Sequence, residues 1–304
     1  MRKELKITNF IKKNWVGYVF ISPVIIGILA FTLYPMVQSL FLSFFREYNV
    51  ITPPKGFGLY NYIKMFKYDP DLLKSIGITT VYTLINVPLS MALSFLLALL
   101  LNKKIKGIGI YRLLIYTPVI IPVTISGLLW KNITNYDYGL ANAVLQNIGL
   151  GKFPFFDKAS TSMLSLILIG FWGLGGGMIL WLSTLKNVPV SLYEAAEVDG
   201  ASKFVKLFKI TIPMCTPMIF YNLIMGIIGS LQTFGSVFTL TGGSAGAGNS
   251  LYFWLMKIYN DTFNILSYTT GYAAAECWLL FAVIAILTVI IFKTSKWVYY
   301  GEEV

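Results

Sequence analysis

The sequence predicts an all-α integral membrane protein with six transmembrane helices, and two observations support this prediction. Of the 304 residues, 56% are hydrophobic and only 12% are charged, whereas a soluble domain carries about 25% charged residues. A helix needs about 20 apolar residues to cross a bilayer core of about 30 Å, and the chain contains six such runs. We expect the whole chain, 1–304, to form a single transmembrane domain.

The six apolar runs are separated by polar connections. Their approximate limits, in chain order, are 17–45, 76–101, 108–129, 163–185, 214–239 and 272–291. The first run is too long for the apolar part of a signal peptide and no cleavage pattern follows it, so we expect it to be retained. Prolines occur inside the runs at positions 23, 35, 88, 118 and 122. Membrane helices tolerate such kinks where neighbours satisfy the freed backbone groups.

The distribution of positive charge predicts which side of the membrane each connection faces. With both termini in the cytoplasm, 15 of the 24 lysines and arginines lie on the cytoplasmic side, as the positive-inside rule favours. We therefore expect longer outer loops at about 46–75, 130–162 and 240–271, and a cytoplasmic location for the charged segment 187–213. The net charge of +11 is then an orientation signal, and we expect no nucleic-acid partner.

The segment 187–213 reads like part of a soluble protein, although apolar runs flank it. Ser191 and Glu194 fit a capping box at the start of a short helix. We expect this helix to cover about 192–198.

A second helix is predicted after a turn in the same segment. Gly200 allows a turn that side chains with a Cβ atom resist, and Asp199 is placed to cap the helix that follows. Pro213 then opens the fifth run. This second helix is amphipathic, because apolar and basic residues fall on opposite faces: Phe204, Leu207 and Phe208 against Lys203, Lys206 and Lys209.

Two interpretations of this amphipathic helix are open from the residues alone. It could lie on the membrane surface, with its lysines at the lipid headgroups. Alternatively, the helix–turn–helix could dock its apolar residues into a groove on a cytoplasmic partner.

Some chemistries are excluded by composition. The chain has no histidine, which excludes a His-ligated metal site and a histidine general base; no metal site is expected. The two cysteines, Cys215 and Cys277, are expected to be buried packing residues. The chain contains no phosphate-binding G-x-x-x-x-G-K-[ST] motif, so ATP could be hydrolysed only by a separate subunit.

Polar residues inside the apolar runs are candidates for a path through the membrane. Asn222, Met225, Gly229 and Gln232 share one helix face, which fits either such a path or close helix packing. Glu276 is a carboxylate within the sixth run, where it costs about 2.5–3.5 kcal/mol at the helix centre. It is expected to face a cavity or a partner; protonation, a hydrogen bond to a neighbouring helix and snorkelling to the outer interface are alternatives.

The segment 187–213 carries a resemblance to a known family. Its pattern resembles the EAA loop of permease subunits of ATP-binding-cassette (ABC) importers, with Ile212 as a mild departure from leucine. The matching positions are Glu194-Ala195-Ala196, Gly200, Ile210 and Ile212-Pro213.

Further segments resemble the carbohydrate-uptake branch of that family, the maltose and glycerol-phosphate type. They are GLYNYIKMF (58–66), DYGLANAVL (137–145), LQTFGSVFTLTGG (231–243) and GYAAA (271–275). Together they cover nearly the whole chain. They resemble the maltose-permease-like first partner of a heterodimeric pair.

The resemblance implies a type I ABC importer permease fold in the cytoplasmic membrane of a prokaryote. It also implies a mechanism in which the 187–213 loop sits in a cleft of the ATPase subunit and passes nucleotide-driven closure to the spans. The implied coupling residues are Glu194, Ala195, Ala196, Asp199, Gly200, Phe204 and Pro213.

The implied partners are a second homologous permease, a dimer of ABC subunits that binds ATP and Mg²⁺, and an extracellular sugar-binding protein. This chain itself is expected to bind no cofactor. Gln232 and Trp172 match positions at or near the sugar site of the maltose-type permease. The expected substrate-pathway residues are therefore Gln232, Glu276, Trp172, Asn222 and Gly229.

Two other function classes compete with an importer subunit. An ATP-independent secondary transporter or channel is one alternative, but ion-coupled carriers usually need several intramembrane ionisable groups, and an inverted repeat is not evident. A membrane enzyme is the other, although a catalytic group is hard to assemble from one intramembrane carboxylate without histidine.

Overall fold

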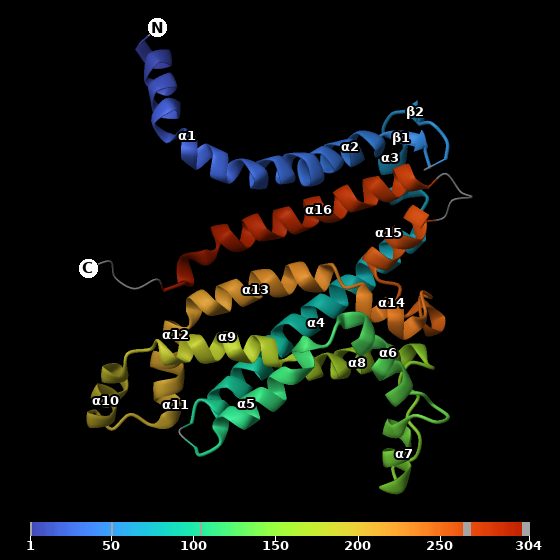
Figure 1. Cartoon of the computed structure of the whole chain (residues 1–304). Helices are drawn as coiled ribbons and strands as arrows, with labels where there is room; N and C mark the ends of the chain where they lie inside the picture. The colour runs from blue at the N-terminus through green and yellow to red at the C-terminus, as the bar shows by residue number, and fades with distance from the viewer. Residues whose placement is uncertain (1, 50, 104, 264–268, 300–304) are drawn as a thin grey trace. The chain divides into compact units, whose positions relative to one another are not determined.

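The computed structural model describes residues 2–49, 51–103, 105–263 and 269–299, with side chains described from residue 14 onwards. The described chain is predominantly helical (Figure 1). It divides into two compact units. One consists of Met1–Tyr68 with Asn260–Leu279, and the other of Asp69–Tyr259 with Leu280–Val304.

The smaller unit begins with a long helix that contains a wide turn. The π-helical turn η1 precedes Pro35, a residue that has no N–H to continue the α-helical hydrogen bonding. The elements are α1 (Arg2–Ile28), η1 (Leu29–Leu33), α2 (Tyr34–Leu42), β1 (Phe45–Glu47), β2 (Lys55–Phe57) and α3 (Tyr60–Lys67). The two strands form an antiparallel hairpin that pairs Phe45 with Phe57.

Polar side chains fix the smaller unit where α2 ends. The buried Asn61 amide donates to the carbonyl oxygens of Ser43 and Phe45, each at 2.8 Å. The early part of α16 (Thr270–Lys293) joins this unit, and there the Trp278 indole N–H donates to the Ser39 hydroxyl at 3.2 Å. These bonds hold α2, α3 and the start of α16 together.

The larger unit contains the remaining helices. They are α4 (Pro70–Leu101), α5 (Ile108–Tyr116), η2 (Thr117–Ile120), α6 (Val123–Ile133), α7 (Leu140–Asn147), α8 (Ala159–Gly170), η3 (Phe171–Gly173), α9 (Gly175–Lys186), α10 (Val190–Val198), α11 (Lys203–Lys206), η4 (Leu207–Thr211), α12 (Ile212–Met214), α13 (Thr216–Leu231), α14 (Gly235–Thr241), η5 (Ala247–Asn249) and η6 (Ser295–Trp297). Helix α15 (Trp254–Phe263) belongs partly to each unit.

Helix α4 runs through the larger unit and packs against α9 and α13 (Figure 1). One buried cluster forms around Tyr82, Leu166 and Phe253, and another around Ala98, Trp181 and Cys215. The prediction that both cysteines are buried holds for Cys215 but is wrong for Cys277, which is exposed on α16. The two clusters surround opposite ends of α4 and fix the helices that flank it.

The six predicted apolar runs correspond to helices of different regularity. Among the described residues, four stretches are long and apolar enough to cross a membrane: Asn14–Leu42, Pro70–Leu101, Thr216–Thr241 and Thr270–Lys293. The third and fourth predicted runs are each broken into two helices. The structure thus offers four spans, or six if each bent pair makes one crossing.

The third run is the more sharply broken, and proline explains the break. Ile108–Ile120 and Val123–Ile133 meet at 98°. Ile121 is extended, with φ −74° and ψ 127°, because the ring of Pro122 disfavours helical geometry in the residue before it. The expectation of one kinked but continuous helix over 108–129 is therefore corrected to two helices. The fourth run bends by 50° at Leu174, between η3 and α9.

Candidate functional site

The 187–213 loop forms the predicted helix–turn–helix. Helix α10 ends in a tight turn in which the Ala201 N–H donates to the Ala196 carbonyl at 2.8 Å. Gly200 has φ +72°, a left-handed conformation that glycine adopts without a steric cost. Figure 1 shows the α10–α11 pair projecting beyond the end of α9. The prediction of a glycine turn is confirmed.

The predicted caps of the two short helices are wrong. Helix α10 starts at Val190, directly after Pro189, so Ser191 lies inside the helix and makes no capping hydrogen bond. Pro189 precedes the helix with ψ 128°, and its carbonyl accepts the first helical hydrogen bond, from the Leu192 N–H at 3.3 Å. Ser202, which is extended, caps α11 by accepting from the Val205 N–H at 3.4 Å, whereas Asp199 is the residue at which α10 ends.

Apolar side chains are exposed around the turn of the loop. Val198 is 89% exposed, Phe204 75% and Phe208 62%. Glu194, Ala195, Asp199 and Gly200 are also exposed, while Ala196 and Pro213 are half-buried. The predicted second helix is present as one continuous helical segment, in which α11 is followed by the π-helical turn η4 and by α12, where Pro213 lies. The loop therefore presents a small apolar surface next to carboxylates.

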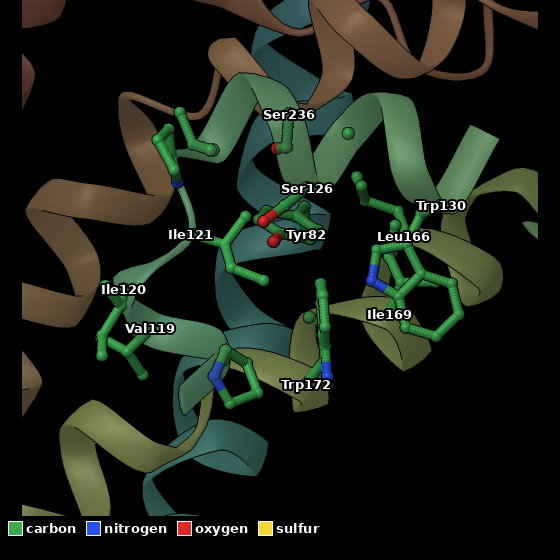
Figure 2. A pocket seen from close by; sticks show the side chains of 16 residues that line it. Tyr82, Val119, Ile120, Ile121, Ser126, Trp130, Leu166, Ile169, Trp172 and Ser236 are labelled. Carbon is green, nitrogen blue, oxygen red and sulfur yellow. The ribbon is translucent and has the colours of Figure 1, made fainter. Parts of the chain in front are cut away.

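A first cavity of about 540 Å³ lies in the larger unit, beside the break in the third predicted run. Its wall is formed by η2 and the break after it (118–122), by the first two turns of α6, by α8 and η3, and by one residue each of α4 and α14. Figure 2 shows the hydroxyl groups of Tyr82, Ser126 and Ser236 gathered beside Ile121, with the indole rings of Trp130 and Trp172 on the other side. The cavity thus combines aromatic faces with hydroxyl groups.

The two tryptophans of the first cavity contact each other edge to face. Their ring centroids are 5.6 Å apart and the rings are inclined at 85°, a favourable aromatic geometry. The buried indole N–H of Trp130 has no hydrogen-bond acceptor among the described residues. The sequence singled out Trp172 but missed Trp130, whose position in the cavity depends on the bend at Pro122.

A second cavity of about 230 Å³ shares Gly170 and Gly173 with the first. Asn86 on α4 donates to the Ser230 hydroxyl at 3.3 Å and accepts from the Ser90 hydroxyl at 3.3 Å. Asn222 on α13 also lines this cavity. The sequence prediction missed Asn86 and Ser90, although their four-residue spacing within an apolar run was a readable signal.

The other expected pathway residues are placed differently. Gly229 and Gln232 are exposed and line neither cavity, and Gln232 ends α13, with φ −100° and ψ 21°. Glu276 is fully buried on α16, within the smaller unit. The structure therefore brings Trp172 and Asn222 to adjoining cavities and leaves Gly229, Gln232 and Glu276 outside their walls.

Known proteins are similar to this chain over nearly its full length. The chain is 39% identical to the probable ABC transporter permease protein YesP of Bacillus subtilis, over 96% of this chain and 94% of YesP. It is 30% identical to the lactose transport system permease protein LacF of Rhizobium radiobacter, over 92% of this chain and 94% of LacF.

The fold matches a solved transporter as well. A chain in the crystal structure of a bacterial ABC transporter involved in the import of the acidic polysaccharide alginate superposes with a TM-score of 0.85. The match covers 96% of this chain and 98% of that chain at 21% sequence identity, so it supports the fold.

The family model described as "Binding-protein-dependent transport system inner membrane component" matches residues 90–300. This range contains the whole 187–213 loop, both broken runs, and the lining residues of both cavities except Tyr82, Asn86 and Val87. The resemblance to permease subunits of ABC importers is confirmed. The chain belongs to the family of binding-protein-dependent inner-membrane transport components and is a multi-pass membrane permease subunit.

Proposed function

We propose that this chain is the membrane-spanning subunit of an ATP-driven importer that carries a carbohydrate, with an oligosaccharide the favoured class, across the cytoplasmic membrane by alternating access. The whole chain acts as one permease domain with six crossings. ATP and Mg²⁺ are bound by a separate pair of ATPase subunits. A second homologous permease and an extracellular sugar-binding protein complete the assembly.

The exposed 187–213 loop is the observation that carries the proposal. Helices α10 and α11 form a compact pair joined by the Gly200 turn. Val198 and Phe204 flank this turn as an exposed apolar surface, with Glu194 and Asp199 nearby. This shape favours docking into a protein groove, and the coupling residues are Glu194, Ala195, Ala196, Asp199, Gly200, Phe204 and Pro213.

The first cavity supports a carbohydrate as the substrate class. Indole rings stack on the apolar faces of sugar rings, and the Trp130 N–H and the hydroxyls of Tyr82, Ser126 and Ser236 match sugar hydroxyls. Relatives carry matching descriptions, such as lactose transport and trehalose/maltose transport. Trp172 and Asn222 are proposed to contact the substrate within this chain, while Gln232, Gly229 and Glu276 are proposed to contribute from outside the two cavities.

Reconstitution of the full complex tests this function. The chain, its second permease and the ATPase subunits are co-purified and inserted into proteoliposomes, and sugar uptake is measured with and without ATP and the sugar-binding protein. We expect uptake only with both. Sugar movement by this chain alone, without nucleotide, would establish the secondary-transporter alternative.

Two loop variants test the proposed coupling. Gly200→Pro cannot adopt φ +72°, and Glu194→Lys reverses an exposed charge at the proposed contact. Both variants should insert into the membrane at normal levels and lose most ATP-driven uptake. Normal uptake by both would contradict a role for the loop in coupling.

A further inference from the structure

A partly buried pair of hydroxyl groups joins the two halves of the 187–213 loop. The Tyr193 hydroxyl on α10 lies 2.9 Å from the Thr211 hydroxyl, at the end of η4. Thr211 is only 5% exposed. Tyr193 packs against the core cluster of Trp181, Leu185 and Cys215. The pair therefore links α10 to the root of the fifth span across 18 residues of chain.

The direction of these hydrogen bonds follows from counting protons. The Thr211 hydroxyl also donates to the Lys206 carbonyl, five residues earlier, at 3.3 Å. A threonine hydroxyl has one proton, so when Thr211 donates to the Lys206 carbonyl, the Tyr193 hydroxyl donates to Thr211. Tyrosine, threonine and the carbonyl then form one chain of hydrogen bonds across the π-helical turn.

Thr211 also lies where the loop passes into the membrane helices. Its carbonyl accepts from the Cys215 N–H at 3.1 Å, and α12 begins at the next residue. The π-helical turn before Pro213 widens the helix, since proline supplies no N–H to the regular pattern. The Thr211 hydroxyl spans this wide turn by its hydrogen bond to the Lys206 carbonyl.

An ion pair between Lys206 and Glu197 also joins the two halves of the loop, and it contributes less to their attachment. Lys206 Nζ lies 3.2 Å from the Glu197 carboxylate, whose side chain is 79% exposed. Exposed ion pairs of this kind contribute little to stability. A buried hydrogen bond is costly to lose, because the remaining partner stays without water. The hydrogen bond between Tyr193 and Thr211 therefore stabilises the attachment of α10 more than the ion pair does.

We propose that Tyr193 and Thr211 are positioning residues for transport: their hydroxyl pair holds α10 rigidly to the start of α12. Displacement of α10 by the ATPase is thereby passed to α13 and is not absorbed by rotation at Gly200. This inference rests on the proposed function. It adds the requirement that the loop move as one body with the root of the fifth span.

Isosteric variants of the full complex in proteoliposomes test this inference. Tyr193→Phe and Thr211→Val each remove one hydroxyl, and Thr211→Ser keeps it. The readout is the number of sugar molecules imported per ATP hydrolysed, alongside the amount of ATPase subunit that co-purifies. Thr184→Val is the matched control, because the Thr184 hydroxyl donates to the Leu180 carbonyl of its own helix and, within the described residues, joins no other element.

We expect sugar imported per ATP to fall about fivefold in Tyr193→Phe, the factor that one net hydrogen bond supplies, and at least as far in Thr211→Val, which also removes the bond to the Lys206 carbonyl. The double variant should fall no further than Thr211→Val, because that change already removes the bond to Tyr193. Thr211→Ser and Thr184→Val should match the unmodified complex, and ATPase subunits should co-purify in normal amounts.

Two results would overturn the inference. One is an unchanged ratio of sugar to ATP in both hydroxyl-deleted variants. The other is loss of the ATPase subunits on purification, which would assign the pair to assembly. Failure of the unmodified complex to import sugar with ATP would instead overturn the proposed function.

Discussion

At the scale of single residues, Asp69 connects the start of α4 to Lys257. Its carboxylate accepts from the Leu72 N–H at 3.0 Å and lies 2.8 Å from Lys257 Nζ. The side chains of Asp69 and Lys257 are 11% and 5% exposed. One acidic residue therefore caps a long helix and ties it to α15.

Removal of the lysine should destabilise the protein strongly. Lys257→Met removes one partner of a buried ion pair, a change that costs about 3–5 kcal/mol. We expect a lower thermal unfolding temperature in detergent, measured by tryptophan fluorescence. Lys74→Met, at an exposed position of α4, is the control and should unfold at the normal temperature. Equal temperatures for both variants would show that the ion pair is dispensable.

Trp172 carries the clearest prediction about the substrate. Trp172→Ala removes an aromatic face from the first cavity, and about 1–2 kcal/mol of lost contact corresponds to roughly a tenfold lower rate of sugar uptake. Trp172→Phe should keep most of the uptake. Trp15→Ala, at an exposed position of α1, should have no effect. An alanine variant with normal uptake would place the sugar elsewhere.

At the scale of elements, adjacent glycines at the start of α9 have different roles. A Cβ atom on Gly175 would lie 2.2 Å from the Ile115 carbonyl oxygen, whereas one on Gly176 would make ordinary contact with Val119 at 3.6 Å. Gly175 therefore lets the end of α5 approach α9 backbone to backbone.

Alanine substitutions should separate these two glycines. Gly175→Ala must push α5 away from α9 and should destabilise the protein by about 1–3 kcal/mol, seen as a lower unfolding temperature and faster proteolysis. Gly176→Ala adds the same methyl group without a clash and should be nearly neutral. Identical behaviour of the two variants would contradict the close packing.

The elements also show which features the sequence could predict. Apolar run length located every long helix, and Gly200 located the turn, because both depend on local chemistry. The prolines at 118 and 122 predicted a distorted helix. Sequence patterns do not, however, distinguish a kink within one helix from the 98° break that separates two helices. Ser191 satisfied the capping pattern, yet Pro189 started the helix first.

The candidate site was less predictable than the helices, for a physical reason. Trp130 and Trp172 are 42 positions apart and meet only because the third and fourth runs are both broken. Asn86 was overlooked because an amide in an apolar run has no fixed partner until α13 is packed beside it. The sequence could indicate which single residues are polar or aromatic, whereas the contacts between Trp130 and Trp172 and between Asn86 and Ser230 depend on tertiary structure.

At the scale of the whole molecule, the distribution of charge predicts the topology. Cysteines introduced at Ser202 and Ser244, both within the described chain, should react with a membrane-impermeant maleimide from opposite sides, in a background without Cys215 and Cys277. Ser202→Cys should be labelled only in inside-out vesicles, and Ser244→Cys only in intact cells. Labelling of both from the same side would contradict six crossings with both termini inside.

The bend in the fourth span affects the two cavities that lie beside it. Gly170 and Gly173 lie beside this bend and line both cavities, so the two cavities share these two backbone positions. A change in the angle between η3 and α9 would therefore move the walls of both cavities at once.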